Sequence, residues 1–161
     1  MQPRIETISS KKLIGMCIQM TLNNNQTPEL WKNFMLRRKE ISNNMDANLI
    51  SMQIYDPDLN IRDFTLDTIV NKWASVEVTD MDHIPDGMKS YVLPGGLYAV
   101  FHFKGNISAA PEFFKNIFTR WIPEIGYDVD NSRPHFELLG EKYRNGDPAS
   151  EEDVFIPIKK M

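Results

Sequence analysis

Apolar side chains recur along the chain in two patterns, one typical of helices and one typical of strands. Residues 28–37 (PELWKNFMLR) and 111–120 (PEFFKNIFTR) each carry two adjacent apolar positions followed, one helical turn later, by two more. This spacing places the apolar side chains on one face of a helix. Short runs rich in β-branched and aromatic residues predict strands at 14–20, 49–55, 73–78, 97–103, 135–140 and 154–159.

The two helical segments are also similar in sequence. At an offset of 83 residues, five of the ten positions are identical, namely Pro, Glu, Lys, Asn and Arg. One predicted strand precedes each helix and two follow it, so the halves 10–79 and 95–160 both read β-α-β-β, joined by a Pro- and Gly-containing connector at 80–96. We therefore predict one α+β domain over residues 1–161. Its duplicated units, related by a pseudo-twofold axis, would form an antiparallel sheet with both helices on one face.

The strand residues that face away from the helices form a predicted ligand groove. Side chains alternate between the faces of a sheet, and the helices need an apolar face to pack on. We assign the apolar set of each strand to the helix side, which leaves aromatic and polar residues on the other: Trp73, Glu77, Tyr98, His102, Gln53, Tyr55, His135 and Glu137. Rings and carboxylates together suit flat or cationic organic molecules. The alternative is an ordinary solvated sheet face.

Composition and charge narrow the class of protein. The single cysteine, Cys17, excludes an internal disulfide and favours a reducing compartment. The formal net charge is -4 and the basic clusters are short, which argues against binding nucleic acid or an anionic membrane surface. The first residues lack the apolar stretch of a signal peptide, and no apolar run could span a bilayer. We expect a cytoplasmic protein.

Several loose motifs, in a particular order, resemble the GyrI-like effector-binding domain, also called the AraC-type or bacterial transcription activator effector-binding domain. They cover about residues 10–160 and are ELWKNF, ISMQIYD, KWASVEVTDMDHIPDGM (72–88), LPGGLYAVFHFKG (93–105), PHFELLGEKY (134–143) and DVFIPIKK (153–160). The resemblance implies paired β-α-β-β units around a groove that binds drug-like, often cationic or aromatic molecules. It also implies that Glu137 corresponds to the acidic residue that faces the ligand's charge in multidrug-sensing members.

The resemblance leaves several functions open. Many members follow a DNA-binding domain, for which this chain has no room, so we expect a stand-alone ligand sensor or sequestering protein. One alternative is a hydrolase of electrophilic cytotoxic molecules, with Glu137 as base and Tyr98 or Tyr55 as hydrogen-bond donor. Another is binding of a protein partner, such as a transcription regulator or DNA gyrase.

No cofactor or metal is expected from the sequence. His83, His102 and His135 have no third ligand at metal-binding spacing. Cys17 is expected to be a small strand residue, because catalysis by a thiol needs a base and an orienting group beside it.

Overall fold

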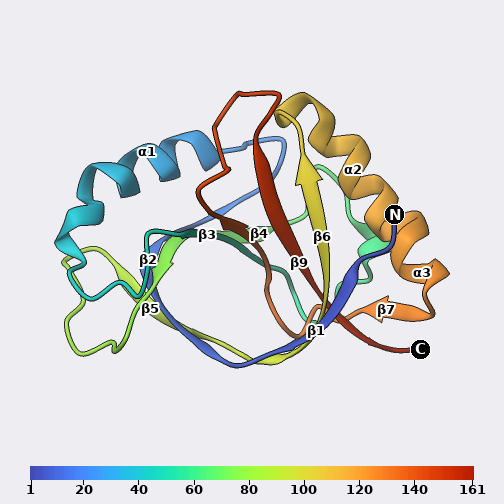
Figure 1. Ribbon diagram of the computed structural model, residues 1–161, viewed down its shortest axis with the longest axis horizontal. Coiled ribbons are helices and arrows are strands. Elements are labelled where there is room, and N and C mark those ends of the chain that lie inside the picture. The colour runs from blue at the N-terminus through green and yellow to red at the C-terminus, as the bar shows by residue number, and fades with distance from the viewer.

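The computed structural model describes all 161 residues and consists of one antiparallel nine-stranded sheet with helices on it (Figure 1). The strands are β1 (Arg4–Ile8), β2 (Lys11–Met20), β3 (Leu49–Ile54), β4 (Val70–Glu77), β5 (Lys89–Leu93), β6 (Gly96–Lys104), β7 (Tyr127–Val129), β8 (His135–Leu139) and β9 (Glu151–Lys160). The helices are α1 (Thr27–Arg37), α2 (Ala110–Asn116) and α3 (Ile122–Glu124), and a π-helical turn (Ile117–Trp121) joins the last two. Single 3-10 turns occupy Arg38–Glu40, Ile61–Asp63 and Ile107–Ala109.

The α+β class and all the predicted helices and strands are confirmed. The structure adds three strands, β1, β5 and β7, of which β5 lies inside the predicted connector. β7 has three residues, and β1 and β5 bury at most one residue each, so none of the three gives a clear hydrophobic pattern. The strand order is β1-β6-β9-β8-β3-β4-β2-β5, with β7 paired to β9. The two central strands are therefore β8 and β3.

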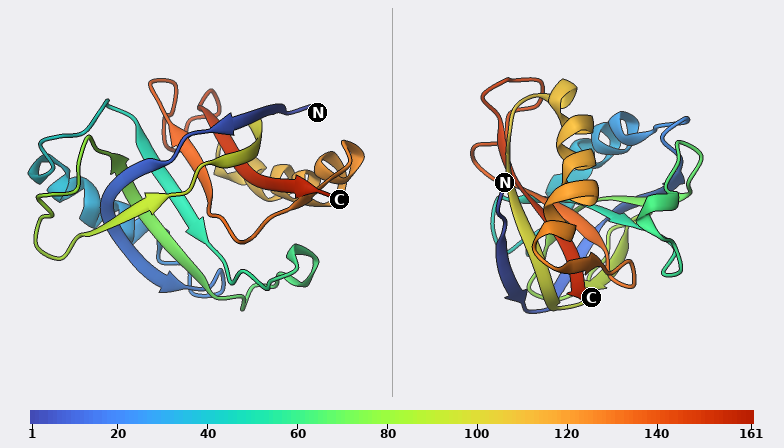
Figure 2. Two further views of the ribbon diagram at one scale, coloured as in Figure 1. Left: turned by 90° about the horizontal axis from the view of Figure 1, so that it is seen from below. Right: turned by 90° about the vertical axis from the view of Figure 1, so that its right-hand side faces the viewer.

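The two long helical segments lie on the same face of the sheet, over opposite ends of it (Figure 2). α1 buries Leu30 and Phe34 against a cluster that includes Ile14 of β2 and Ala74 of β4. The α2 segment buries its own apolar residues against β6 and β9, and these include Phe113 and Ile117. The helices thus cover the outer strands and leave β3 and β8 between them.

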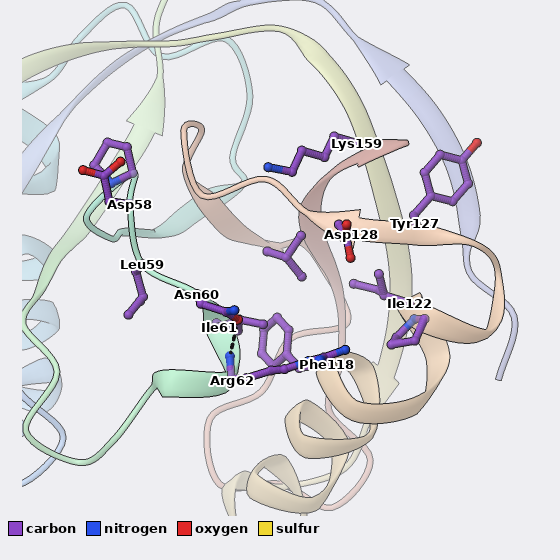
Figure 3. A pocket seen from close by; sticks show the side chains of 13 residues that line it. Asp58, Leu59, Asn60, Ile61, Arg62, Phe118, Ile122, Tyr127, Asp128 and Lys159 are labelled. Atoms are coloured by element: carbon purple, nitrogen blue, oxygen red, sulfur yellow. Dashed lines mark hydrogen bonds between the residues drawn. The ribbon is translucent and has the colours of Figure 1, made fainter. Parts of the chain in front are cut away.

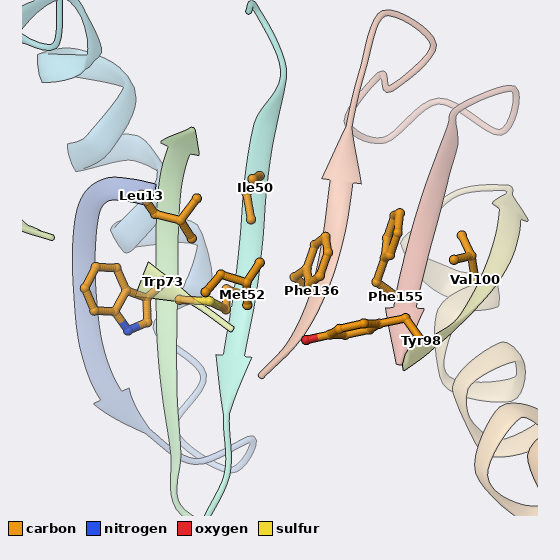
Figure 4. Close-up of a cluster of buried hydrophobic side chains, with 9 residues drawn as sticks. Leu13, Ile50, Met52, Trp73, Tyr98, Val100, Phe136 and Phe155 are labelled. Atoms are coloured by element: carbon orange, nitrogen blue, oxygen red, sulfur yellow. The ribbon is translucent and has the colours of Figure 1, made fainter. Parts of the chain in front are cut away.

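The sheet face that turns away from the helices is a third hydrophobic core (Figure 4). Its buried members come from all strands except β1 and β7 and are Leu13, Ile50, Met52, Trp73, Leu93, Tyr98, Val100, Phe136 and Phe155. Leu13 and Val100 belong to strands near opposite ends of the strand order, so the sheet must curve to bring them into one cluster. Phe136 and Phe155 stack with 4.5 Å between their ring centroids.

This third core corrects the predicted position of the groove. The prediction of a groove on the face away from the helices is wrong, because apolar side chains fill that face. The predicted assignment of side chains to the two faces is correct for β4 and β6, since Ala74 and Phe101 lie under the helices. For β3 and β8 the predicted faces are inverted, because Met52 and Phe136 point to the third core. The polar residues of the central strands therefore point into the gap between the helices.

Candidate functional site: a cleft between the two helices

A cleft of about 650 Å³ lies between α1 and α2, above the central strands. Its walls combine apolar and polar residues, and the apolar ones include Trp31 and Met35 on α1 and Phe114 on α2. Ser51 of β3 and Glu137 of β8 contribute to its lining from the sheet. The volume is in the range of roughly 300–1,000 Å³ that small-molecule sites occupy. The cleft can therefore hold a drug-sized molecule.

Glu137 is a buried carboxylate with one direct side-chain partner. Its residue is 9% exposed, and it lies opposite Ser51 in the β3–β8 ladder. The Gln53 side chain donates from Nε2 to both carboxylate oxygens, at 3.0 and 3.3 Å. An amide neutralises no charge, so the site keeps a negative charge that a cation can compensate. The structure thus brings Glu137 and Gln53 together, as predicted.

Two further charged groups near Glu137 were not among the predicted site residues. Glu152 of β9 lines the cleft, and burial together with the charge of Glu137 raises its pKa to about 8, an effect that Lys72 partly opposes. Lys72 of β4 is 7% exposed, and burial lowers its pKa against the opposing effect of the two carboxylates. β9 begins at Glu151, three residues earlier than predicted, so Glu152 was read as part of a loop. Lys72 lay just before the predicted start of its strand.

Tyr55 and His135 lie beyond Gln53 and Glu137 along the same two strands. Their rings meet edge to face, with 4.9 Å between centroids. His135 Nε2 donates to Asn131 Oδ1 at 2.7 Å, and burial lowers the pKa of His135 to about 3. Burial raises the pKa of Tyr55, as does the charge of Glu137. Both side chains are therefore neutral at physiological pH.

The other predicted site residues lie on the opposite face. Trp73 and Tyr98 belong to the third core. The Tyr98 hydroxyl donates to the Pro134 carbonyl at 3.1 Å, and burial raises its pKa to about 12. Glu77 accepts a hydrogen bond from Lys11 Nζ at 3.4 Å, and His102 is exposed beside carboxylates of β9. The predicted constellation is therefore divided between the two faces of the sheet.

A second cavity of about 370 Å³ lies outside this cleft (Figure 3). The segment 57–62 forms one side of it, and Phe118 and Ile122 of the helical segment face that loop. Arg62, Lys159, Asp58 and Asp128 are among its lining residues, so its charges are of both signs. It contains no carboxylate as buried as Glu137. No group of three His, Cys, Asp or Glu side chains is arranged to hold a metal ion.

A curved antiparallel sheet with two helices and a carboxylate-containing cleft between them is the architecture of a small-molecule binding domain. The model of the GyrI-like small molecule binding domain matches residues 1–159, and the chain belongs to this family. The resemblance seen in the sequence is confirmed.

Relatives and solved structures agree with this assignment. The chain is 29% identical over 131 residues to the transcriptional regulator BrlR of Pseudomonas aeruginosa, which covers 81% of this chain but only 45% of that protein. The structure of SAV2435 bound to tetraphenylphosphonium has the same fold, with a TM-score of 0.70, 18% identity and coverage of 99% and 94% of the two chains. The C-terminal domain of EcmrR gives a TM-score of 0.69 at 10% identity, with coverage of 99% of this chain and 98% of that chain.

None of the helices combines the length and the apolar character that a membrane-spanning helix needs.

Proposed function

We propose that the chain binds organic cations with large apolar or aromatic surfaces in the cleft between α1 and α2. The observation that carries this proposal is the pair of carboxylates, Glu137 and Glu152, at the sheet side of a cleft whose walls include Trp31 and Phe114. A buried carboxylate is costly until a cation or donor meets it. Aromatic walls contribute apolar contact and cation–π attraction to such a ligand. The cation in the SAV2435 structure supports this ligand class.

The proposal includes a role for the two halves of the chain. Counted outward from the centre of the sheet, one half has the order β8, β9, β6 and the other β3, β4, β2. These correspond to the two β-α-β-β units read in the sequence. We infer a pseudo-twofold axis between β8 and β3, so that each half supplies one central strand and one wall helix to the cleft.

We further propose that the chain acts as a ligand sensor or sequestering protein. Its similarity to part of BrlR supports a regulatory setting, and its action without a DNA-binding domain stays a prediction. Hydrolysis of electrophiles and binding of a protein partner also stay predictions. The geometry favours binding over hydrolysis, because Tyr98 lies on the face opposite Glu137 and the Glu137 carboxylate is held by Gln53.

The test is the affinity for tetraphenylphosphonium, measured by isothermal titration calorimetry at pH 8, where Glu152 is partly ionised. Glu137→Gln removes one charge while keeping the shape of the side chain. A charged hydrogen-bonding or ion-pairing partner contributes about 1.5–3 kcal/mol, so we expect the variant to bind roughly 10–100-fold more weakly. Triphenylphosphine oxide, which is uncharged, should bind both proteins equally.

Glu77→Gln is the matched control. Glu77 is also a partly buried strand carboxylate, but it lies on the opposite face and pairs with Lys11. We expect this variant to bind the phosphonium like the unmodified protein. Equal loss of the charged and uncharged ligands in Glu137→Gln, or an equal loss of affinity in Glu77→Gln, would contradict the proposed site.

A further inference from the structure

Glu152 differs from Glu137 in having no partner of its own. It lies on β9 opposite Phe103 of β6, on the same face as Val154 of the core under α2. Glu137 faces Val154 across the β8–β9 ladder, so Glu152 is its diagonal neighbour on the same face. Such neighbours are about 7–8 Å apart. While Gln53 holds the Glu137 carboxylate, Glu152 forms neither a hydrogen bond nor an ion pair with another side chain.

The remaining charged group close to both carboxylates is Lys72. It lies on β4 opposite Gln53 of β3, and its ammonium group forms no ion pair within 4.0 Å. It nevertheless senses the charge of both carboxylates. Tyr143 of the 140–150 loop also lines the cleft, as do Lys32 and Arg144, which are exposed.

Repulsion between the two carboxylates governs the protonation of the ligand-free cleft. Glu137 and Glu152 are diagonal neighbours on one face of the sheet, and two such groups disfavour each other's ionisation. Burial and the charge of Glu137 raise the pKa of Glu152 to about 8, so this group keeps its proton at neutral pH. An organic cation in the cleft would offset the repulsion and favour ionisation of Glu152.

Resting on the proposed function, we propose that Glu152 is a second cation-binding carboxylate of the cleft and that it gives up its proton when a singly charged organic cation binds. The proton passes from the Glu152 carboxyl group to the solvent, and no other bond is made or broken. Cation and proton therefore compete for one carboxylate. Because the coupling is reciprocal, a rise in pH must strengthen cation binding.

The sign and size of the pH dependence follow from this competition. Below about pH 8 the free protein binds one more proton than the complex, so affinity rises as pH rises and becomes constant above that value. Between pH 6.5 and 8 the affinity for tetraphenylphosphonium should rise about tenfold. At pH 7, binding should release close to one proton, and binding of uncharged triphenylphosphine oxide should release none.

Calorimetry of tetraphenylphosphonium binding in phosphate and in Tris, which differ in ionisation enthalpy, counts the released protons. We expect close to one proton for the unmodified protein and none for Glu152→Gln, whose affinity should stay flat from pH 6.5 to 8. Lys72→Met distinguishes proton release by the Glu152 carboxyl group from proton release by the Lys72 ammonium group. If Glu152 is the source, release persists in this variant and its midpoint moves to higher pH, because the lysine lowers the pKa of Glu152.

Phosphonium binding without proton release, release that persists in Glu152→Gln, or release that is lost in Lys72→Met would each overturn the proposal while leaving the proposed function intact. Absence of phosphonium binding at every pH would instead overturn the proposed function itself. Even if Glu152→Gln does not fold, the proton count in the unmodified protein and the Lys72→Met result together decide whether Glu152 releases the proton.

Discussion

The two faces of the central strands differ in composition although they alternate residue by residue along the same chain segments. On the helix side, β3 and β8 present Ser51 and Glu137 to a cleft, and Gln53 donates a hydrogen bond to Glu137. On the other side the neighbouring residues Met52 and Phe136 are 0% and 1% exposed and belong to a core. Burial of apolar area stabilises the fold on one face. The other face is thereby free to keep polar groups that contribute little to stability and can contact a ligand.

The comparison also shows why the helices sit where they do. α1 and α2 pack on the outer strands, so neither of them covers the middle of the sheet. A single broad helix layer would have required apolar residues where Gln53 and Glu137 now lie. The curvature that closes the third core on the far side holds the floor of the cleft in place, because both faces belong to the same strands.

Removal of a large side chain from the apolar face should have the largest effect on stability. Phe136→Ala deletes a ring that stacks on Phe155 and meets Tyr98 edge to face. We expect the free energy of unfolding to fall by about 3–5 kcal/mol, since a cavity replaces the ring. Urea denaturation followed by circular dichroism measures this. Ser51→Ala, on the cleft face of the adjacent strand, is the control and should cost less than about 1 kcal/mol.

A second prediction concerns the pH dependence of stability that arises from His135, a buried residue on the cleft side of the sheet. Burial lowers its pKa in the folded protein to about 3, below the usual histidine value of about 6.5, so the unfolded chain binds an extra proton between these values. Stability is complete above the unfolded pKa and falls as pH drops below it. From pH 7 to 5 this group alone should remove about 2 kcal/mol of unfolding free energy.

Comparison of chemical denaturation at the two pH values in the unmodified protein and in His135→Gln isolates this contribution. The variant should lose about 2 kcal/mol less over the same interval. An equal loss in both proteins would show that His135 is not the buried neutral histidine that the structure describes.

A smaller effect is expected at Tyr98, which the sequence placed in the ligand groove. Tyr98→Phe removes the hydrogen bond to the Pro134 carbonyl and should cost about 1 kcal/mol of stability. The affinity for tetraphenylphosphonium should not change, because the hydroxyl lies on the face away from the cleft. A tenfold loss of affinity in this variant would contradict the separation of the two faces.

Much of the fold could be predicted from the sequence because local pattern determines it. The two helices and the six predicted strands follow from periodicity, whereas the correspondence of the two halves stays a prediction. The site could be predicted only in part. Gln53, Tyr55, His135 and Glu137 do share a face, because alternation along a strand is strict.

The face on which these residues lie depended on an assumption that the sheet has one apolar side. In this protein both sides are apolar under different strands, so the inference failed on β3 and β8 while it held on β4 and β6. A hydrophobic pattern shows which residues of a strand point the same way. It does not show what covers them, since that depends on the curvature of the sheet and on contacts distant in sequence. Glu152 and Lys72 were missed for a simpler reason, because both lie just outside the predicted strand limits.

A crystal structure with tetraphenylarsonium, a close analogue of the phosphonium, would show where the cation binds, because arsenic can be located by anomalous scattering. The account predicts one strong anomalous peak between α1 and α2, within about 6 Å of the Glu137 or Glu152 carboxylate, which is the range of a direct charge interaction. A peak on the opposite face beside Trp73 and Tyr98, or in the cavity lined by Arg62 and Lys159, would contradict the claim that the cleft between the helices is the cation-binding site.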